Sequence, residues 1–217
     1  MRDSMRFNPR RATRRTVLSG LAGASLACAL SLPAAAEGAA ERIADHFASV
    51  KTMTGEFVQF GPKGESTGGK FFIQRPGRLL FLYEQPSPIR VVADGRSLVV
   101  NNKKLDTWDA YPLNKTPLKL LLGDTIDLGS NRVRNVKEDP DLTTIVMGDK
   151  QVFGDSEITM MFDPNTFEIR QWTIRDAQGK DTTVILSNIR TGVRFAEGTF
   201  KIPYARIREK KTGGDSR

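Results

Sequence analysis

Arg75 is the residue of this sequence whose surroundings most need a chemical explanation. It stands in the segment FFIQRPGRLLFLYEQP (residues 71–86), where an apolar run passes through the arginine before the turn Pro76-Gly77. Because alternate side chains of a strand point to opposite faces, Arg75 shares a face with Phe71 and Ile73. A guanidinium stays charged at ordinary pH and carries five hydrogen-bond donors. On the residues alone, the simplest interpretation is a strand-end side chain that extends to water at the turn.

Catalytic and metal-binding chemistry find little support in the remaining residues. His46 is the only histidine, and Cys28, the only cysteine, lies in the N-terminal segment that we expect to be removed. No serine stands in a nucleophile motif, so a catalytic triad would rest on His46 alone, and the number of His and Cys residues excludes a His/Cys metal cage. The carboxylates at 138–141 and 155–157 stand beside turn residues, where Asp and Glu are common, with calcium binding as the alternative. The sequence therefore predicts no enzymatic activity, no metal and no cofactor.

Gly64 to Lys70 (GESTGGK) nearly spells a phosphate-binding loop. Phe71 stands where that motif needs Ser or Thr, and a strand rather than a helix is expected next, so we interpret the segment as a glycine-rich hairpin. Trp108 and Trp172 have rings that can stack on bases or sugars. No basic stripe accompanies them, so we assign them to the core or to the wall of a cavity.

The first 36 residues have the layout of a secretory signal peptide. Basic residues between Arg2 and Arg15 precede an apolar run, Val17 to Leu32, and the small-residue site Ala34-Ala35-Ala36 follows. This layout predicts cleavage before Glu37. The run is shorter than the roughly 20 residues that a bilayer needs, which disfavours a membrane anchor. Arg14-Arg15 resemble a twin-arginine signal, so twin-arginine export and general secretion both stay open.

Removal of this segment changes the electrostatics of the chain. The whole sequence has 33 Lys and Arg against 25 Asp and Glu, a formal charge of +8. Residues 37–217 keep 27 basic and 24 acidic residues, a formal charge of +3. A strongly basic domain would favour nucleic acid, and we expect no such partner here. Cys28 lies in the removed segment, with Ser25 where a lipoprotein acylation motif needs leucine.

Residues 37–217 are expected to form one mainly β (α+β) domain. Ile43, Phe47 and Val50 recur at helical spacing, which predicts an amphipathic helix over 39–51. Later, short runs rich in Val, Ile, Phe and Thr alternate with turn signals and predict about eleven antiparallel strands that curl into a barrel or half-barrel. These runs lie at 54–60, 69–75, 78–84, 89–94, 97–101, 104–109, 132–138, 142–147, 156–163, 166–175 and 181–190. Only 117–122, at most extended to 128, suggests a second helix.

Several predicted strands are apolar on both faces, most clearly Leu79 to Tyr83. An antiparallel sheet with one wet face alternates apolar and polar residues, so both faces of this sheet must be covered. Two short helices can cover only a small part of one face of the sheet. Either they complete a filled core, or they leave an apolar cavity that a hydrophobic ligand fills.

Several segments carry a resemblance to a known family. They are Gly55 to Phe60 (GEFVQF), Gly69 with the following FFIQRPGRL, Tyr83 to Pro86 (YEQP), Val92 to Leu98 (VADGRSL) and Thr116-Pro117-Leu118. Together they resemble the periplasmic outer-membrane lipoprotein carriers of the LolA family. The resemblance covers most of residues 37–217 and is looser in the C-terminal half.

The resemblance implies an unclosed antiparallel β-barrel with a helical lid over an apolar cavity, in which the acyl chains of lipoproteins bind. It assigns to Arg75 the role of a latch, which holds the lid shut by hydrogen bonds to backbone carbonyls of the lid helices until a lipoprotein enters. The expected cavity residues are Phe71, Ile73, Leu79, Phe81, Tyr83, Trp108, Leu118, Leu121, Met160, Phe162 and Trp172.

The same resemblance implies a monomeric periplasmic chaperone and its partners. An ATP-driven, ABC-type inner-membrane complex would release acylated lipoproteins to it, and an outer-membrane receptor would accept them. Two alternatives remain in the binding class: the receptor of the same fold, which needs an acylated N-terminal cysteine, and a carrier of another lipid or glycolipid. An envelope-stress sensor domain of this fold is a third, and an enzyme is the weakest.

Overall fold

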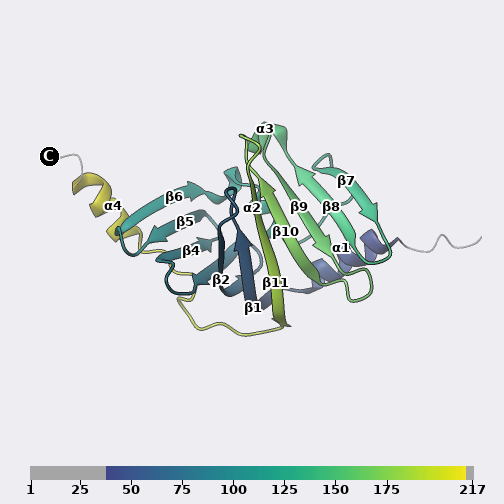
Figure 1. The fold of residues 1–217 in the computed structure, drawn as a ribbon, viewed down its shortest axis with the longest axis horizontal. Coiled ribbons are helices and arrows are strands. Elements are labelled where there is room, and N and C mark those ends of the chain that lie inside the picture. The colour runs from purple at the N-terminus through teal and green to yellow at the C-terminus, as the bar shows by residue number, and fades with distance from the viewer. Residues whose placement is uncertain (1–37, 214–217) are drawn as a thin grey trace, which may run out of the picture. The chain divides into compact units, whose positions relative to one another are not determined.

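The computed structural model describes residues 38–213, so the predicted signal peptide lies outside the described residues. Its centre is one 11-stranded sheet with the strand order β6-β5-β4-β3-β2-β1-β11-β10-β9-β8-β7 (Figure 1). Apart from β6 and β7, strands that are neighbours in the sequence pair with one another, and the β1–β11 pair joins the two halves. The strands are β1 (Thr52–Phe60), β2 (Ser66–Gln74), β3 (Arg78–Tyr83), β4 (Ile89–Asp94), β5 (Ser97–Asn102), β6 (Thr107–Pro112), β7 (Val133–Glu138), β8 (Thr143–Gly148), β9 (Glu157–Phe162), β10 (Ile169–Arg175) and β11 (Asp181–Thr191).

The sheet is unclosed, because β6 and β7 form its two ends. All pairs are antiparallel, which confirms the predicted fold class and the number of strands. One boundary differs from the prediction. The Oδ1 atom of Asn102 accepts hydrogen bonds from the backbone N–H groups of Lys104 and Leu105, at 3.0 and 3.1 Å. This side-chain contact makes a turn, so β6 begins at Thr107 rather than at residue 104.

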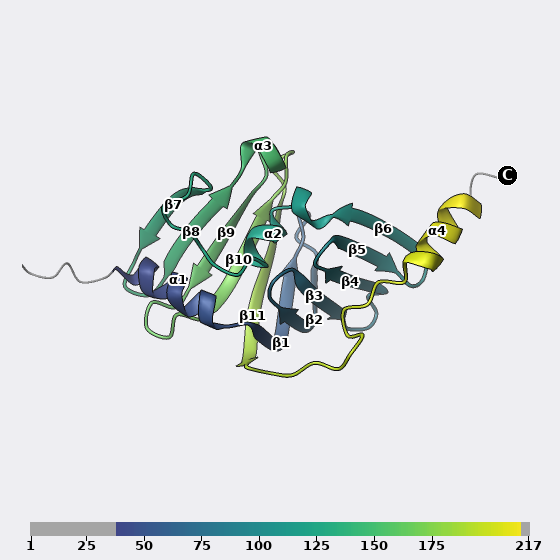
Figure 2. The same cartoon turned by 180° about the vertical axis from the view of Figure 1, so that it is seen from behind.

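The helices are short, and two of them lie over the same face of the sheet. Figure 2 shows α1 (Ala39–Ser49) and α2 (Leu118–Leu121) in front of the strands, and we call the face that they cover the inner face. The predicted second helix is therefore real but shorter than expected, and the 3-10 turn η1 (Leu113–Lys115) precedes it. α3 (Lys150–Phe153) and α4 (Tyr204–Gly213) were not predicted. Within residues 38–213, no helix is long and apolar enough to cross a membrane.

The opposite face, here the outer face, is covered over β2–β6 by the C-terminal segment. Leu80, Val92 and Val99 form a second apolar cluster with Phe200, Ile202 and Ile207. After β11 the chain passes the lower ends of β1 and β2, at the bottom of Figure 1, and reaches α4 beside β4–β6 (yellow). This explains why β3 is apolar on both faces: each face has its own cover.

Polar contacts hold α4 in place. The hydroxyl of Tyr204 donates to Asp94 Oδ2 at 2.7 Å, and Arg206 Nη2 donates to Asp106 Oδ1 at 3.0 Å. Lys210 also pairs with Asp106. The basic stretch that begins at Arg206 is therefore part of a docked helix.

Trp108 lies on the outer face, and its assignment to the inner cavity was wrong. It pairs with Asn101 across the β5–β6 ladder and packs against the outer cluster. Its Nε1 donates to Asp106 Oδ1 at 3.4 Å, and the guanidinium of Arg206 lies 5.8 Å from the ring centre. Pairing residues of an antiparallel ladder share a face, so the register of β6 decides the direction of this side chain.

Candidate functional site

The predicted cavity residues other than Trp108 gather on the inner face. Phe71, Ile73, Leu79, Phe81, Leu118, Leu121, Met160, Phe162 and Trp172 belong to one buried cluster, and Tyr83 packs against it. Ile43 and Phe47 of α1 complete the cluster from above. The strand parity of β2 and the helical spacing of α1 therefore selected side chains that meet in space, although they come from distant segments.

Aromatic rings form the middle of this cluster. The Phe81 ring stacks on Phe57 with centroids 4.5 Å apart, and on the other side it lies 6.0 Å from Trp172. Tyr83 meets Phe57 edge-on at 5.0 Å. The sequence analysis did not single out Phe57. Its parity with Met53 along β1 was the available signal, because both side chains point to the inner face.

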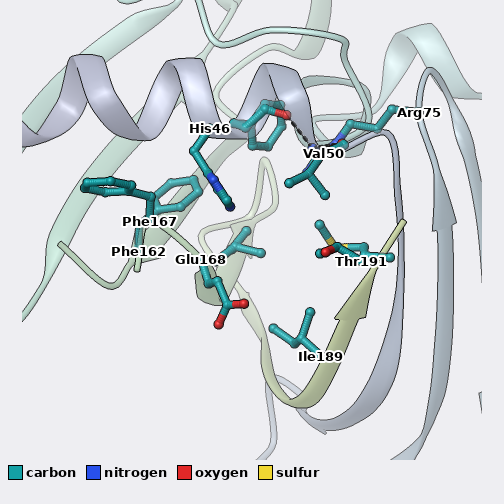
Figure 3. A pocket seen from close by; sticks show the side chains of 11 residues that line it. His46, Val50, Arg75, Phe162, Phe167, Glu168, Ile189 and Thr191 are labelled. Carbon is teal, nitrogen blue, oxygen red and sulfur yellow. Dashed lines mark hydrogen bonds between the residues drawn. The ribbon is translucent and has the colours of Figure 1, made fainter. Parts of the chain in front are cut away.

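The inner face is filled in this structure, so of the two possibilities left open by the sequence the described state is the filled core. The space beneath the end of α1 has a volume of about 20 Å³, with Phe47, Met53, Arg75 and Ile169 among its lining residues (Figure 3). A space of that size holds about one water molecule. An acyl chain can enter only if α1 or the neighbouring loops move.

Arg75 connects the sheet to the end of α1. Its side chain is only 5% exposed, and its Nη1 donates to the backbone oxygens of Phe47 and Val50, both at 2.8 Å (Figure 3). These carbonyls belong to the C-terminal turn of α1, where helices leave oxygens without intrahelical partners. The guanidinium carbon also lies 3.5 Å from the centre of the Phe47 ring. Arg75 therefore does not extend to water, as its sequence position alone had suggested.

The free-energy cost of burying the Arg75 charge is close to the gain from its hydrogen bonds. Desolvation lowers the pKa of its guanidinium from its ordinary value to about 10, against the opposing effect of the Asp124 carboxylate. The side chain remains charged at neutral pH, and a depression of this size corresponds to a burial cost of about 3 kcal/mol. Hydrogen bonds from a charged donor contribute about 1.5–3 kcal/mol each. Cost and gain are thus of similar size.

A second charged residue holds the other end of α1. Gly38 provides no side-chain cap, and the Oε1 atom of Glu138, at the end of β7, accepts a hydrogen bond from the backbone N–H of Ala40 at 2.7 Å. A carboxylate at the N-terminus and a guanidinium at the C-terminus both complement the helix dipole. The sequence analysis had read Glu138 as a turn carboxylate, because nothing local indicates a partner 98 residues away.

Glu138→Ala is expected to loosen the first turn of α1 and to lower the free energy of unfolding by about 1 kcal/mol, the usual contribution of a helix cap. Hydrogen exchange of the amides of residues 40–42 should become faster, with the sheet unchanged. Glu138→Gln is the matched control, since its amide oxygen can still accept the bond. Equal exchange in the alanine variant and the wild type would show that the cap does not hold the helix.

Tyr83 reports on the burial of the inner face. Its hydroxyl donates to Gln59 Oε1 at 2.6 Å, and burial raises the pKa of the phenol to about 12. Between about pH 10 and 12 the folded protein keeps this proton, whereas the unfolded chain loses it, so stability should fall as pH rises above about 10. The tyrosinate absorbance of wild type minus Tyr83→Phe should have its midpoint near pH 12. A midpoint near 10 would mean that Tyr83 is accessible to water.

Metal chemistry has no counterpart in the described part of the chain. Within residues 38–213, no group of three or more His, Cys, Asp or Glu side chains is placed to hold a metal ion. The site consists instead of a filled apolar core and a helix over it, which charged side chains contact at both ends.

These features define a class of protein: an unclosed antiparallel β-barrel whose inner apolar face is closed by a short helical lid. A family model described as outer membrane lipoprotein carrier protein LolA matches residues 48–203. The chain therefore belongs to the LolA family, which consists of carrier proteins rather than enzymes.

Two sequence relatives of known name agree with this assignment. The outer-membrane lipoprotein carrier protein of Halorhodospira halophila is 29% identical over 187 residues, which cover 81% of this chain and 86% of the relative. The protein of the same name from Pseudomonas putida is 26% identical over 211 residues, covering 88% of this chain and 94% of the relative. The crystal structure of the LolA superfamily protein NE2245 from Nitrosomonas europaea superposes with a TM-score of 0.42 at 8% identity, covering 76% of this chain and 98% of that one.

Proposed function

We propose that this protein carries acylated lipoproteins through the periplasm, with their acyl chains bound on the inner face of the sheet beneath α1 and α2. Family membership supports the cargo class. The observation that carries the mechanism is the Arg75 contact, in which a buried cation ties a short helix to the sheet over an apolar chamber. Opening requires the loss of only these few polar contacts and of the packing of Ile43 and Phe47.

The energetics of acyl chains explain the need for such a chamber. Burial of each CH₂ group stabilises a bound chain by about 0.8 kcal/mol, so a lipoprotein with long chains stays in its membrane unless another apolar surface replaces it. The carrier must also release its cargo, so the bound state must be less favourable than the acceptor. Re-formation of the Arg75 contacts and of the inner core on closing supplies that opposing free energy.

The partners in this proposal are an ATP-driven inner-membrane release complex, which loads the carrier, and an outer-membrane receptor, which unloads it. Residues 1–36 would serve as the export signal, and residues 37–217 would work as a monomeric carrier. N-terminal sequencing of the mature protein tests the processing. A start at Glu37 supports it, whereas a start at an acylated Cys28 would make the chain a membrane-bound receptor.

A release assay tests the function. Spheroplasts that carry labelled, acylated lipoproteins would be incubated with purified residues 37–217 and ATP, and the supernatant analysed by native mass spectrometry. We expect lipoprotein in the supernatant as a one-to-one complex with the carrier. Absence of lipoprotein, together with another lipid bound to the protein, would overturn the cargo assignment in favour of a carrier for that lipid.

Neighbouring positions of β3 provide a matched test of the binding face. Phe81 belongs to the inner cluster and Leu80 to the outer cluster. A photo-crosslinking amino acid at Phe81 is expected to label the acyl chains of bound lipoprotein, and the same residue at Leu80 is expected to give little labelling. Stronger labelling from Leu80 would place the chains on the outer face and contradict the proposal.

A further inference from the structure

Arg75 has hydrogen-bonding capacity that the closed lid does not use. Its Nη1 serves both carbonyls of α1, whereas Nε and Nη2 are buried and have no acceptor within hydrogen-bond distance among residues 38–213. A buried donor without an acceptor costs about 1–3 kcal/mol, and more when it is charged. In this environment only one of the three guanidinium nitrogens of Arg75, Nη1, has hydrogen-bond acceptors.

The Arg75 side chain borders a small space beneath the end of α1. Arg75 lines the space beneath the end of α1, whose other walls are largely apolar, with His46 and Glu168 at its sides (Figure 3). Neither of these two side chains is hydrogen-bonded to the guanidinium. The side chain follows directly on β2, whose inner-face residues Ile73 and Phe71 lead toward the aromatic middle of the chamber.

Entry of an acyl chain would leave more donors of Arg75 without an acceptor, unless the ligand itself carries acceptor atoms. Displacement of α1 removes the oxygens of Phe47 and Val50, so all five donors of Arg75 would then face hydrocarbon. A buried charge without a partner is strongly unfavourable. Pure hydrocarbon is thus a poor match for this site, and a chain with a carbonyl at its head is a good one.

We propose that Arg75 is the subsite for an acyl ester carbonyl of the cargo, so that its guanidinium exchanges the carbonyls of α1 for an ester oxygen when the carrier is loaded. This inference rests on the proposed function and names the chemical group that the site recognises. An acyl chain that lies along β2 past Ile73 and Phe71 ends with its carbonyl beside Arg75. Two helix carbonyls are given up and one ester is gained, so loading stays reversible.

The test compares two lipopeptides that differ only in this carbonyl. One carries an S-glyceryl group with palmitoyl esters on its cysteine, and the other carries hexadecyl ethers in the same places. The wild-type protein is expected to bind the ester about tenfold more tightly, the equivalent of about 1.4 kcal/mol. Arg75→Leu is expected to bind both peptides with the same affinity, and Arg75→Lys, which keeps the charge with fewer donors, should show an intermediate preference.

Arg90→Leu is the matched control. Arg90 also has a buried Nε without an acceptor, but it pairs with Leu82 on the outer face of the sheet. This variant should keep the wild-type preference for the ester. Infrared spectroscopy of a ¹³C-labelled ester gives a direct reading, since the carbonyl stretch should move to lower frequency on binding to the wild type and not on binding to Arg75→Leu.

The outcomes separate this inference from the function on which it rests. Equal binding of ester and ether by the wild type would overturn the ester subsite and leave the carrier function intact. An ester preference that persists in Arg75→Leu would place the carbonyl at another residue and would also overturn it. Failure of both peptides to bind would overturn the carrier function itself, and the inference with it.

Discussion

Arg75→Leu is expected to bind lipoproteins and yet to hand them on to outer membranes at least tenfold less efficiently than the wild type. In the empty carrier Arg75 makes two hydrogen bonds to the end of α1, at 2.8 Å each. Their loss weakens the closed state more than the loaded state, where at most one ester would replace them. A net loss of one charge-assisted bond, about 1.5–3 kcal/mol, changes the ratio of the two states about tenfold or more.

The measurement is the transfer of labelled lipoprotein from preloaded carrier to outer-membrane vesicles, with the bound fraction determined by native mass spectrometry. Arg90→Leu, on the outer face, should transfer its cargo at the wild-type rate. Hydrogen exchange of α1 should be faster in Arg75→Leu, with the strands unchanged. Wild-type transfer by Arg75→Leu would show that the arginine stabilises the fold without controlling the lid.

Gly69→Ala is expected to lower the free energy of unfolding by about 3 kcal/mol, the upper part of the range for an overpacked core. A Cβ atom at this position would lie 2.2 Å from the backbone oxygen of Leu82 and 2.9 Å from the Phe57 ring. Neither can move aside easily, because Leu82 belongs to the paired strand β3 and Phe57 is stacked on Phe81. The absent side chain is what lets these aromatic rings approach the sheet.

The adjacent glycine supplies the control. A Cβ atom at Gly68 would lie on the other face, 3.3 Å from the backbone oxygen of Phe57 and 3.7 Å from the Glu84 carboxylate. Gly68→Ala should therefore stay within about 0.5 kcal/mol of the wild type, as for most surface substitutions. Urea denaturation of both variants measures the difference. Similar midpoints for the two would mean that the β1–β2–β3 ladder adjusts to the extra methyl group.

Local periodicity explains why much of the fold could be predicted from the sequence. The period of two along β2 assigned Phe71, Ile73 and Arg75 to one face, and the structure buries all three. The helical spacing of Ile43 and Phe47 predicted α1, and the turn signals predicted the number of strands. These features depend on residues a few positions apart, so a short stretch of sequence contains the whole signal.

The register between distant segments decided the rest. Glu138 caps a helix 98 residues away, and Tyr204 bonds to Asp94 across 110 residues. Neither pairing leaves a local pattern in the sequence, so the prediction of Glu138 as a turn carboxylate was incomplete and the docked helix α4 was not predicted. The place of Trp108 in the inner cavity, which the resemblance implied, was wrong because the register of the β5–β6 pair directs this side chain to the outer face.

Strand β3, which is apolar on both faces, shows what the local sequence predicts and what only the tertiary structure decides. Its apolar residues indicate that both faces are covered, but they do not show that Phe81 lies on the inner face and Leu80 on the outer face. That choice depends on what covers each side: α1 and α2 for one, the C-terminal segment and α4 for the other. The sequence by itself determined most of the strands, the first helix and the face that Arg75 shares with Phe71 and Ile73. Only the tertiary structure decided which carbonyls that arginine meets, because burial and hydrogen-bond partners arise from segments that meet only after folding.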